Sequence, residues 1–148
     1  MQYYKLSKKL AWISLLLLTA ACSTPSDKVF LQKAEVVSDE LLDAMADEDY
    51  DLALNLYDAR FFERLSKNEW QTILKRLNEK LGNYQSRKIT ASNVSHGFST
   101  ISTTTTVLVY RVYYEKSYSI QKFTFMSDQK SEKMSLVGHY IDYPEIEK

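Results

Sequence analysis

Apolar residues recur at three- and four-residue intervals over residues 26–81, the spacing that places them on one side of a helix. A long helix is predicted over residues 26–46 and a shorter one from residue 50 onward. The buried stripe of the first consists of Phe30, Ala34, Val37, Leu41 and Met45. The stripe of the second consists of Tyr50, Ala53, Leu54 and Tyr57, and a short helix or turn is expected at residues 59–65.

A third helix carries explicit start and stop signals. The segment Ser66-Lys67-Asn68-Glu69 is a capping box, in which the side chains of the first and last residues bond to each other's backbone N–H groups. Gly82 supplies a residue suited to ending the helix. The apolar stripe between these signals consists of Trp70, Ile73, Leu74, Leu77 and Leu81.

After Gly82 the pattern changes to the two-residue alternation of strands. Strands are predicted over residues 84–94, 99–115, 118–126 and 134–143, with turns at His96-Gly97 and at residues 127–130. Because no helix is left to cross over between parallel strands, we expect an antiparallel sheet. The order of elements predicts an α+β fold, with three N-terminal helices packed on a curved sheet of about four strands.

The long second strand is apolar on both faces. Leu108, Tyr110, Val112 and Tyr114 fall on one face, and Val107, Val109, Arg111 and Tyr113 fall on the other. Helices can cover only one of these faces. The other face is expected to line a ligand cavity, to pack against a second subunit, or to remain as half-exposed aromatic edges, since tyrosine suits interfaces.

The first 22 residues have the three-part layout of a secretory signal. Three lysines precede an apolar run over residues 10–18, small residues follow, and Cys22 is the only cysteine. The run is shorter than the ~20 residues that an ordinary transmembrane helix needs. The alternative interpretation is an ordinary signal peptide with an incidental cysteine, but a lone thiol in an exported protein has no disulfide partner.

The segment Leu18-Thr19-Ala20-Ala21-Cys22 resembles the bacterial lipobox, although Thr19 replaces the commoner leucine. The resemblance implies cleavage before Cys22, a diacylglyceryl group on its thiol and an acylated new amine. It divides the chain into a signal peptide (residues 1–21), a lipidated cysteine with a short tether (22–27) and one domain (28–148). Ser23 implies sorting to the periplasmic face of the outer membrane in a cell with two membranes.

Charge and composition narrow the function classes. Hydrophobic residues make up 45% of the 148-residue chain, which is enough to form a core. Without residues 1–21 the chain has 16 basic and 19 acidic residues, a net charge of −3, and this argues against nucleic acid as a partner. Between Glu35 and Asp51 there are eight acids and no base, read either as a solvated helix face or as a site for a cation or basic partner.

The last strand holds the candidate catalytic groups. His139 and Tyr140 are expected on opposite faces because successive side chains alternate. Tyr140 shares a face with Asp142, which would act as a general base if it were buried, and is otherwise an exposed residue at the strand end. His139 is expected to share its face with Val137 and Ile141 as a hydrogen-bonded core histidine, and His96 to be exposed in its turn. We find no convincing catalytic set and expect no metal or cofactor.

The order of elements resembles the nuclear-transport-factor-2-like (cystatin-like) superfamily. Asp49-Tyr50-Asp51-Leu52-Ala53 is similar to the start of the second helix in many members, and residues 70–82 are similar to a segment of small exported bacterial members. The resemblance implies a cone-shaped roll with a cavity between sheet and helices. Some members catalyse there with Asp, His and Tyr, and most bind or dimerise.

Three functions are compatible with these patterns. The first is a non-enzymatic binding or assembly module, lipid-anchored in the cell envelope, that pairs with itself or with another envelope protein. The second is a pocket protein for a small apolar ligand. The third is an isomerase- or dehydratase-like enzyme with Asp142 or a histidine beside a tyrosine in the cavity. The residues proposed to form a pocket or interface are Tyr110, Tyr114, Phe123, Phe125, Tyr140 and Asp142.

Overall fold

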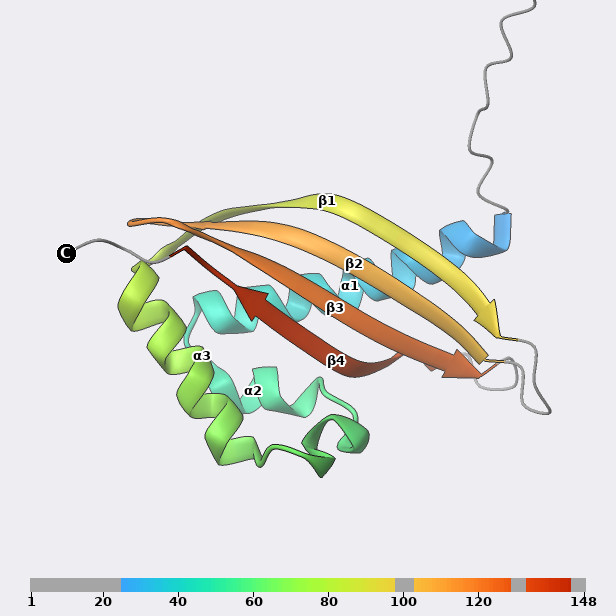
Figure 1. Cartoon of the computed structure of the whole chain (residues 1–148), viewed down its shortest axis with the longest axis horizontal. Coiled ribbons are helices and arrows are strands. Elements are labelled where there is room, and N and C mark those ends of the chain that lie inside the picture. Colours follow the sequence, from blue (N-terminus) through green and yellow to red (C-terminus); the bar gives the residue numbers. More distant parts are fainter. Residues whose placement is uncertain (1–24, 98–102, 129–132, 145–148) are drawn as a thin grey trace, which may run out of the picture.

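A computed structural model describes residues 25–97, 103–128 and 133–144 (Figure 1). Its helices are α1 (Pro25–Ala46), α2 (Tyr50–Asn55), the 3₁₀ helix η1 (Ala59–Glu63) and α3 (Lys67–Leu81). Its strands are β1 (Tyr84–Gly97), β2 (Thr103–Tyr114), β3 (Tyr118–Asp128) and β4 (Ser135–Asp142). The signal peptide, Cys22 and Ser23 lie outside the described residues. No described helix is both long and apolar enough to span a bilayer.

The predicted α+β class is confirmed. The strands form one four-stranded sheet in the order β1-β2-β3-β4, and each neighbouring pair is antiparallel. Figure 1 shows the helices on the same side of the curved sheet. We call the side that faces the helices the inner face and the opposite side the outer face. The three helices therefore cover the inner face.

Local sequence signals set the helix ends. Helix α1 begins at Pro25, whose fixed φ and missing N–H suit the first helical position. Both bonds of the capping box between Ser66 and Glu69 are present at the start of α3. Gly82 ends that helix with a φ of 83°, and a Cβ there would lie 3.0 Å from the Cβ of Glu115.

One residue of the predicted α3 stripe faces outward. Trp70, Leu74, Leu77 and Leu81 are buried, but the side chain of Ile73 is 40% exposed. At 100° per residue, Ile73 sits about 60° to one side of Trp70, at the margin of the stripe. The buried side of α3 is narrower than the sequence pattern predicted. The prediction that Ile73 is buried was therefore wrong.

The strands run further than the turn signals predicted. His96 and Gly97 belong to β1, where they pair with Thr104 and Thr103. Ser127 and Asp128 likewise continue β3 and pair with the same two threonines. The ladder hydrogen bonds override the turn preference of these polar residues, so both turn predictions were wrong where the structure tests them. The rest of the second predicted turn, residues 129 and 130, lies outside the described residues.

A bulge in β4 changes which side chains share the inner face. Thr124 pairs with Gly138 and Phe125 with Leu136, which leaves Val137 without a partner. Leu136 and His139 are therefore both buried although they are three residues apart. The prediction that Val137 shares the face of His139 was wrong, whereas Ile141 does pack against the core beside His139.

Candidate functional site

Four of the residues proposed to form a pocket are core residues of the inner face. Tyr110, Phe123 and Phe125 are completely buried, and Tyr114 is nearly so. The rings of Tyr110 and Phe123 pack edge to face at a centroid distance of 5.6 Å. None of the four lines either of the two hollows described below. They fill the space between sheet and helices.

A buried hydrogen-bonded network crosses this core. The Tyr57 hydroxyl lies 2.6 Å from Nδ1 of His139, and Nε2 of His139 lies 3.0 Å from Oε1 of Gln121. The Gln121 amide donates in turn to the Tyr114 hydroxyl and to Ser119 Oγ, each at 3.0 Å. Because Oε1 can only accept, His139 carries its proton on Nε2 and accepts the Tyr57 proton at Nδ1. Each member therefore has a partner.

The surroundings of His139 keep it neutral. Burial lowers its pKa to about 3, and burial likewise raises the pKa of the Tyr57 hydroxyl well above its usual range. The histidine ring lies 4.3 Å from the ring of Phe123 and 5.3 Å from the indole of Trp70, centroid to centroid. A neutral imidazole enclosed in this way orders the core. The expectation of a hydrogen-bonded core histidine is confirmed.

The partners of His139 were not found in the sequence. Tyr57 was assigned to the second helix, but α2 ends at Asn55, and Tyr57 forms an isolated parallel bridge with Leu136. The Asp58 N–H donates to the carbonyl of Leu136 at 2.9 Å, which fixes this crossing. Tyr57 and His139 are 82 positions apart in the sequence, so no local pattern predicts their contact.

The second histidine joins the start of α1 to the sheet. Nε2 of His96 lies 2.9 Å from Oδ1 of Asp27, and Nδ1 lies 3.0 Å from Oγ1 of Thr104. The ring of Phe30 packs against the imidazole at a centroid distance of 6.0 Å. This line of acid, histidine and hydroxyl resembles a nucleophile triad in order only, because Thr104 is buried. Its evident role is to hold α1 on the end of β1.

The helical side of the molecule is acidic. A hollow of about 500 Å³ lies along α1 and α2, and its carboxylates are Asp39, Glu40, Asp43, Asp47 and Asp49. Arg87 reaches from β1 to this side, with its Nε 2.8 Å from Asp39 and a second ion pair to Asp43. No three acidic, histidine or cysteine side chains in the described part of the chain are placed to hold a metal ion.

A smaller hollow lies between α1, α3 and the start of β1. It measures about 330 Å³, and Tyr50, Lys75, Asn78 and Tyr84 are among its lining residues. Asn78 donates to the Met45 carbonyl at 3.1 Å and to the Tyr50 hydroxyl at 3.2 Å. These bonds join α3 to the end of α1, so the polar groups here are used within the fold.

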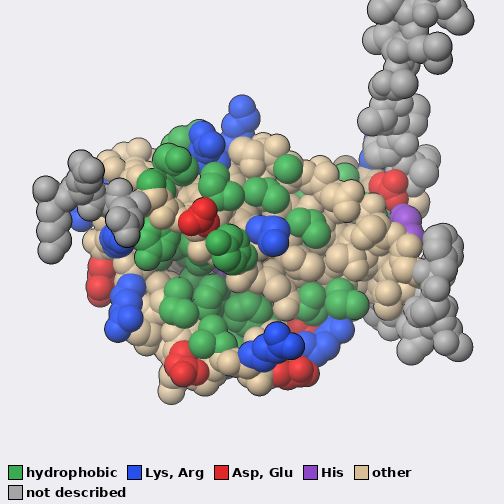
Figure 2. All heavy atoms as spheres, in the orientation of Figure 1, with side chains coloured by type: hydrophobic (Ala, Val, Ile, Leu, Met, Phe, Trp, Pro, Cys, Tyr) green, Lys and Arg blue, Asp and Glu red, His purple; other side chains and the backbone are tan. Residues whose placement is uncertain are grey.

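Tyr140 and Asp142 project from the outer face, on the side of β4 opposite His139. Tyr140 is 59% exposed and Asp142 is also exposed. The sheet thus separates the exposed carboxylate from the buried imidazole, and the two do not form an acid–base pair. Figure 2 shows hydrophobic side chains gathered over the strands, with Lys and Arg among them.

The outer face also holds cations and further tyrosines. Tyr113 and Tyr118 are each more than one-third exposed, and no described helix or strand packs over them. The Arg111 guanidinium lies 4.8 Å from the ring centroid of Tyr118, and Nζ of Lys122 lies 5.7 Å from that of Tyr140. The predicted alternation of β2 is confirmed, because its other set of side chains is buried.

Comparisons with known proteins do not assign a family. No protein-family model matches the sequence, and no curated protein matches it. Among solved structures, the chain is similar to the beta subunit of the benzoate 1,2-dioxygenase from Burkholderia mallei ATCC 23344, at 11% identity and a TM-score of 0.39. That match covers 80% of this chain and 88% of the other. At this level of similarity it carries no argument about function.

Proposed function

We propose that this protein is a lipid-anchored component of the bacterial cell envelope that acts by binding, through the outer face of its sheet, and not by catalysis. The observation that carries the proposal is the outer face itself. It presents exposed tyrosines and cations, and no described element covers it. Exposed aromatic residues gathered on one uncovered face and surrounded by polar groups commonly mark a binding surface.

The anchor is proposed from residues 1–22. A secretory signal that ends in the only cysteine resembles a lipoprotein signal, and the first described helix begins at Pro25, three residues later. Two or three acyl chains hold a protein stably at a bilayer, since each buried methylene contributes about 0.8 kcal/mol. The domain would then sit close to the membrane surface.

A binding role is favoured over catalysis by the positions of the ionisable groups. His139 is enclosed and neutral, Asp142 lies exposed across the sheet from it, and His96 is bonded on both ring nitrogens. A binding role through the outer face is also favoured over a ligand cavity, because the aromatic residues expected to line one are packed in the core.

The anchor can be tested by mass spectrometry of the full chain expressed in a bacterial host. We expect the mature protein to begin at an acylated Cys22 and a Cys22→Ser variant to lose the acyl mass and the membrane fraction. An unmodified thiol, or a chain still intact from Met1 in the cytosol, would remove the anchor from the proposal.

The binding face can be tested by hydroxyl-radical footprinting of the same chain, in membranes and after solubilisation in detergent. We expect Tyr140 and Tyr118 to be protected in membranes and to become reactive in detergent. Ile73 on α3 is similarly exposed and serves as the control, with equal reactivity in both samples. If each tyrosine reacted equally in membranes and in detergent, the outer face would bind nothing in the membrane sample.

A further inference from the structure

We propose that the outer face of the sheet docks on anionic phospholipid headgroups of the same bilayer that holds the lipid anchor. This inference rests on the proposed function and specifies its partner. The docking surface is defined by a cationic row of Lys88, Arg111 and Lys122, from three neighbouring strands, and by the rings of Tyr118 and Tyr140 beside that row.

The cationic row is costly for the fold alone. Lys88 lies directly opposite Arg111 in the register of β1 and β2, and like charges in such cross-strand positions are destabilising. Lys122 is opposite Val109, on the strand next to Arg111. None of the three makes an ion pair with a described residue. An anionic partner would remove this repulsion.

The neighbouring tyrosines fit a membrane surface. Tyrosine and tryptophan gather at the level of lipid headgroups, where an apolar ring and a polar end are both accommodated. On the outer face Tyr118 lies beside Arg111, and Tyr140 lies beside Lys122. A row of cations with aromatic rings beside it can therefore contact phosphates and the apolar boundary together.

The acidic residues do not oppose this orientation, because they are concentrated on the other side of the sheet. The carboxylates of the larger hollow belong to α1 and α2. Among the side chains that the structure describes, Asp142 is the carboxylate of the outer face, and it is opposite Ile120 in the register. The chain is thus cationic toward the proposed membrane and anionic away from it, despite its net charge.

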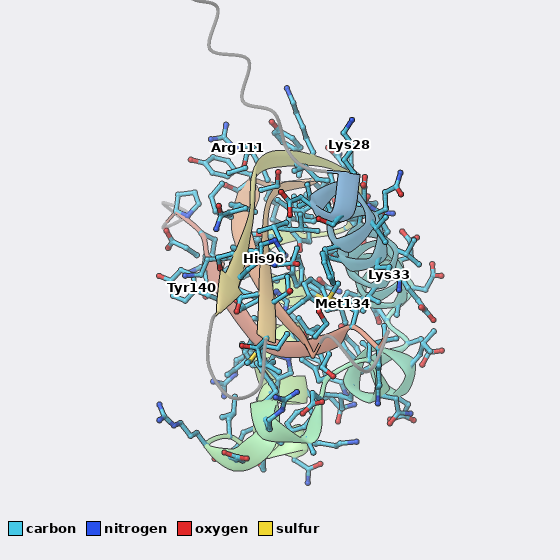
Figure 3. All side chains as sticks on the ribbon, turned by 90° about the vertical axis from the view of Figure 1, so that its right-hand side faces the viewer. Lys28, Lys33, His96, Arg111, Met134 and Tyr140 are labelled. Carbon is cyan, nitrogen blue, oxygen red and sulfur yellow. The ribbon has the colours of Figure 1, made fainter. Side chains whose placement is uncertain are left out.

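An anchored chain reaches the membrane with this face when β1 lies along the bilayer, because the anchor attaches near one end of that strand. Three residues from Cys22 to Pro25 span at most about 10 Å. The bond between Asp27 and His96 fixes that start at the end of β1, and Lys88 lies about 26 Å further along the strand at 3.3 Å per residue. Figure 3 shows Lys28, on the first turn of α1, and Arg111 both toward the top of the view, with Arg111 and Tyr140 on the left and Lys28 with α1 on the right.

A symmetric dimer through the same face is the competing occupant. Two copies placed face to face would bring six unpaired cations into one interface, and burying like charges together is unfavourable. An anionic surface meets the same residues with opposite charge. Charge complementarity therefore favours the lipid headgroups over a second copy.

The test uses the full, acylated chain reconstituted in vesicles. An environment-sensitive fluorophore is attached at Ala91→Cys, an exposed position opposite Val109, and its quenching by headgroup-labelled lipid is measured. We expect stronger quenching in vesicles of equal parts phosphatidylcholine and phosphatidylglycerol than in phosphatidylcholine alone. A label at Ile73→Cys on α3 should show no such difference.

Charge reversal then tests whether the cationic row is responsible for the docking. Each cation near an anionic surface raises the membrane-binding constant roughly fivefold. The double variant Arg111→Glu with Lys122→Glu should therefore lower the ratio of docked to undocked chain about 30-fold or more. The matched control, Lys75→Glu with Arg76→Glu on α3, should leave quenching unchanged. If the glutamate variant does not fold, Arg111→Gln with Lys122→Gln should give a smaller loss in the same direction.

The outcomes separate the two proposals. Equal quenching in both kinds of vesicle, or quenching that survives the Arg111 and Lys122 changes, overturns headgroup docking while the chain still floats with the vesicles. Quenching that depends on protein density instead of phosphatidylglycerol overturns it in favour of a second copy. A chain that does not float with the vesicles at all refutes the lipid anchor instead.

Discussion

Lowering the pH should destabilise this protein through the buried His139. Burial lowers the pKa of His139 to about 3 in the folded chain, whereas an unfolded histidine titrates near 6.5. Below about pH 6.5 the unfolded chain therefore binds a proton that the folded chain excludes. The contribution of neutral His139 to the free energy of unfolding is complete above the unfolded pKa of about 6.5. It is lost as the pH falls toward the folded pKa of about 3.

The size of the effect follows from the pKa difference. Each pH unit between the two pKa values lowers the free energy of unfolding by about 1.4 kcal/mol for one proton. From pH 6.5 to pH 5 the loss should approach about 2 kcal/mol, a large part of the 5–15 kcal/mol that stabilises an ordinary domain. The pKa of Asp58 is lowered by its bonds with Arg60, so its contribution is lost only at more acidic pH.

Urea unfolding of the purified chain, followed by circular dichroism at half-unit steps from pH 7.5 to pH 4.5, measures this slope. His139→Gln removes the titration but keeps an amide that can accept from Tyr57 and donate to Gln121. We expect this variant to be less stable at pH 7 and to have a flatter pH dependence. His96→Gln is the control, since it removes the other histidine. A flat profile for the wild type, or an unchanged slope in His139→Gln, would refute the reasoning.

Three further predictions test the local physics of the fold. Tyr57→Phe removes the donor to a buried imidazole nitrogen and should lower the free energy of unfolding by about 1–3 kcal/mol, whereas Tyr140→Phe on the outer face should change it by less than about 0.5 kcal/mol in the same urea titration. Gly82→Ala forces a Cβ toward Glu115 at a φ of 83° and should cost about 1–3 kcal/mol, visible as a lower Tm; an unchanged Tm would show that the turn relaxes freely. Asp27→Asn with His96→Gln should speed amide hydrogen exchange in the first turns of α1 and leave α3 unaffected, and equal protection of α1 in both chains would contradict the proposed role of that contact.

Sequence patterns predicted the parts of the fold that local chemistry determines. The capping box at Ser66 and the glycine at Gly82 bound α3 because their effects reach only a few residues. The alternation in β2 separated buried from exposed side chains because strand geometry fixes it residue by residue. These signals involve no distant contact, so a single sequence is enough to reveal them.

Apart from Ile73 at the margin of the α3 stripe, the failures involve contacts that lie outside the local sequence pattern. His96 and Ser127 were assigned to turns by their neighbours' composition, yet the ladders on both sides of β2 hold them in strands. The bulge at Val137 arises from pairing between β3 and β4, and its local signal is the adjacent Gly138, because an isolated glycine in a strand often marks a bulge. The contact between Tyr57 and His139 depends on the same tertiary arrangement. Of the candidate site, the sequence therefore identified His139 but not the groups that are hydrogen-bonded to it.

The inner and outer faces of the sheet differ in how their polar side chains are paired, and this difference favours the outer face as the functional surface. On the inner face the polar side chains of Tyr57, Gln121 and His139 are bonded to one another, so a change there costs stability and offers a partner nothing. On the outer face Lys88 and Arg111 repel each other with no carboxylate between them. A sequence that departs from local consistency at one exposed place commonly does so for function. That argument makes the repulsion measurable without any ligand: Lys88→Glu should raise the free energy of unfolding by a few tenths of a kcal/mol up to about 1 kcal/mol, and lower salt should enlarge the gain. A destabilised Lys88→Glu variant would show that the row is satisfied within the fold and would leave lipid docking without its physical basis.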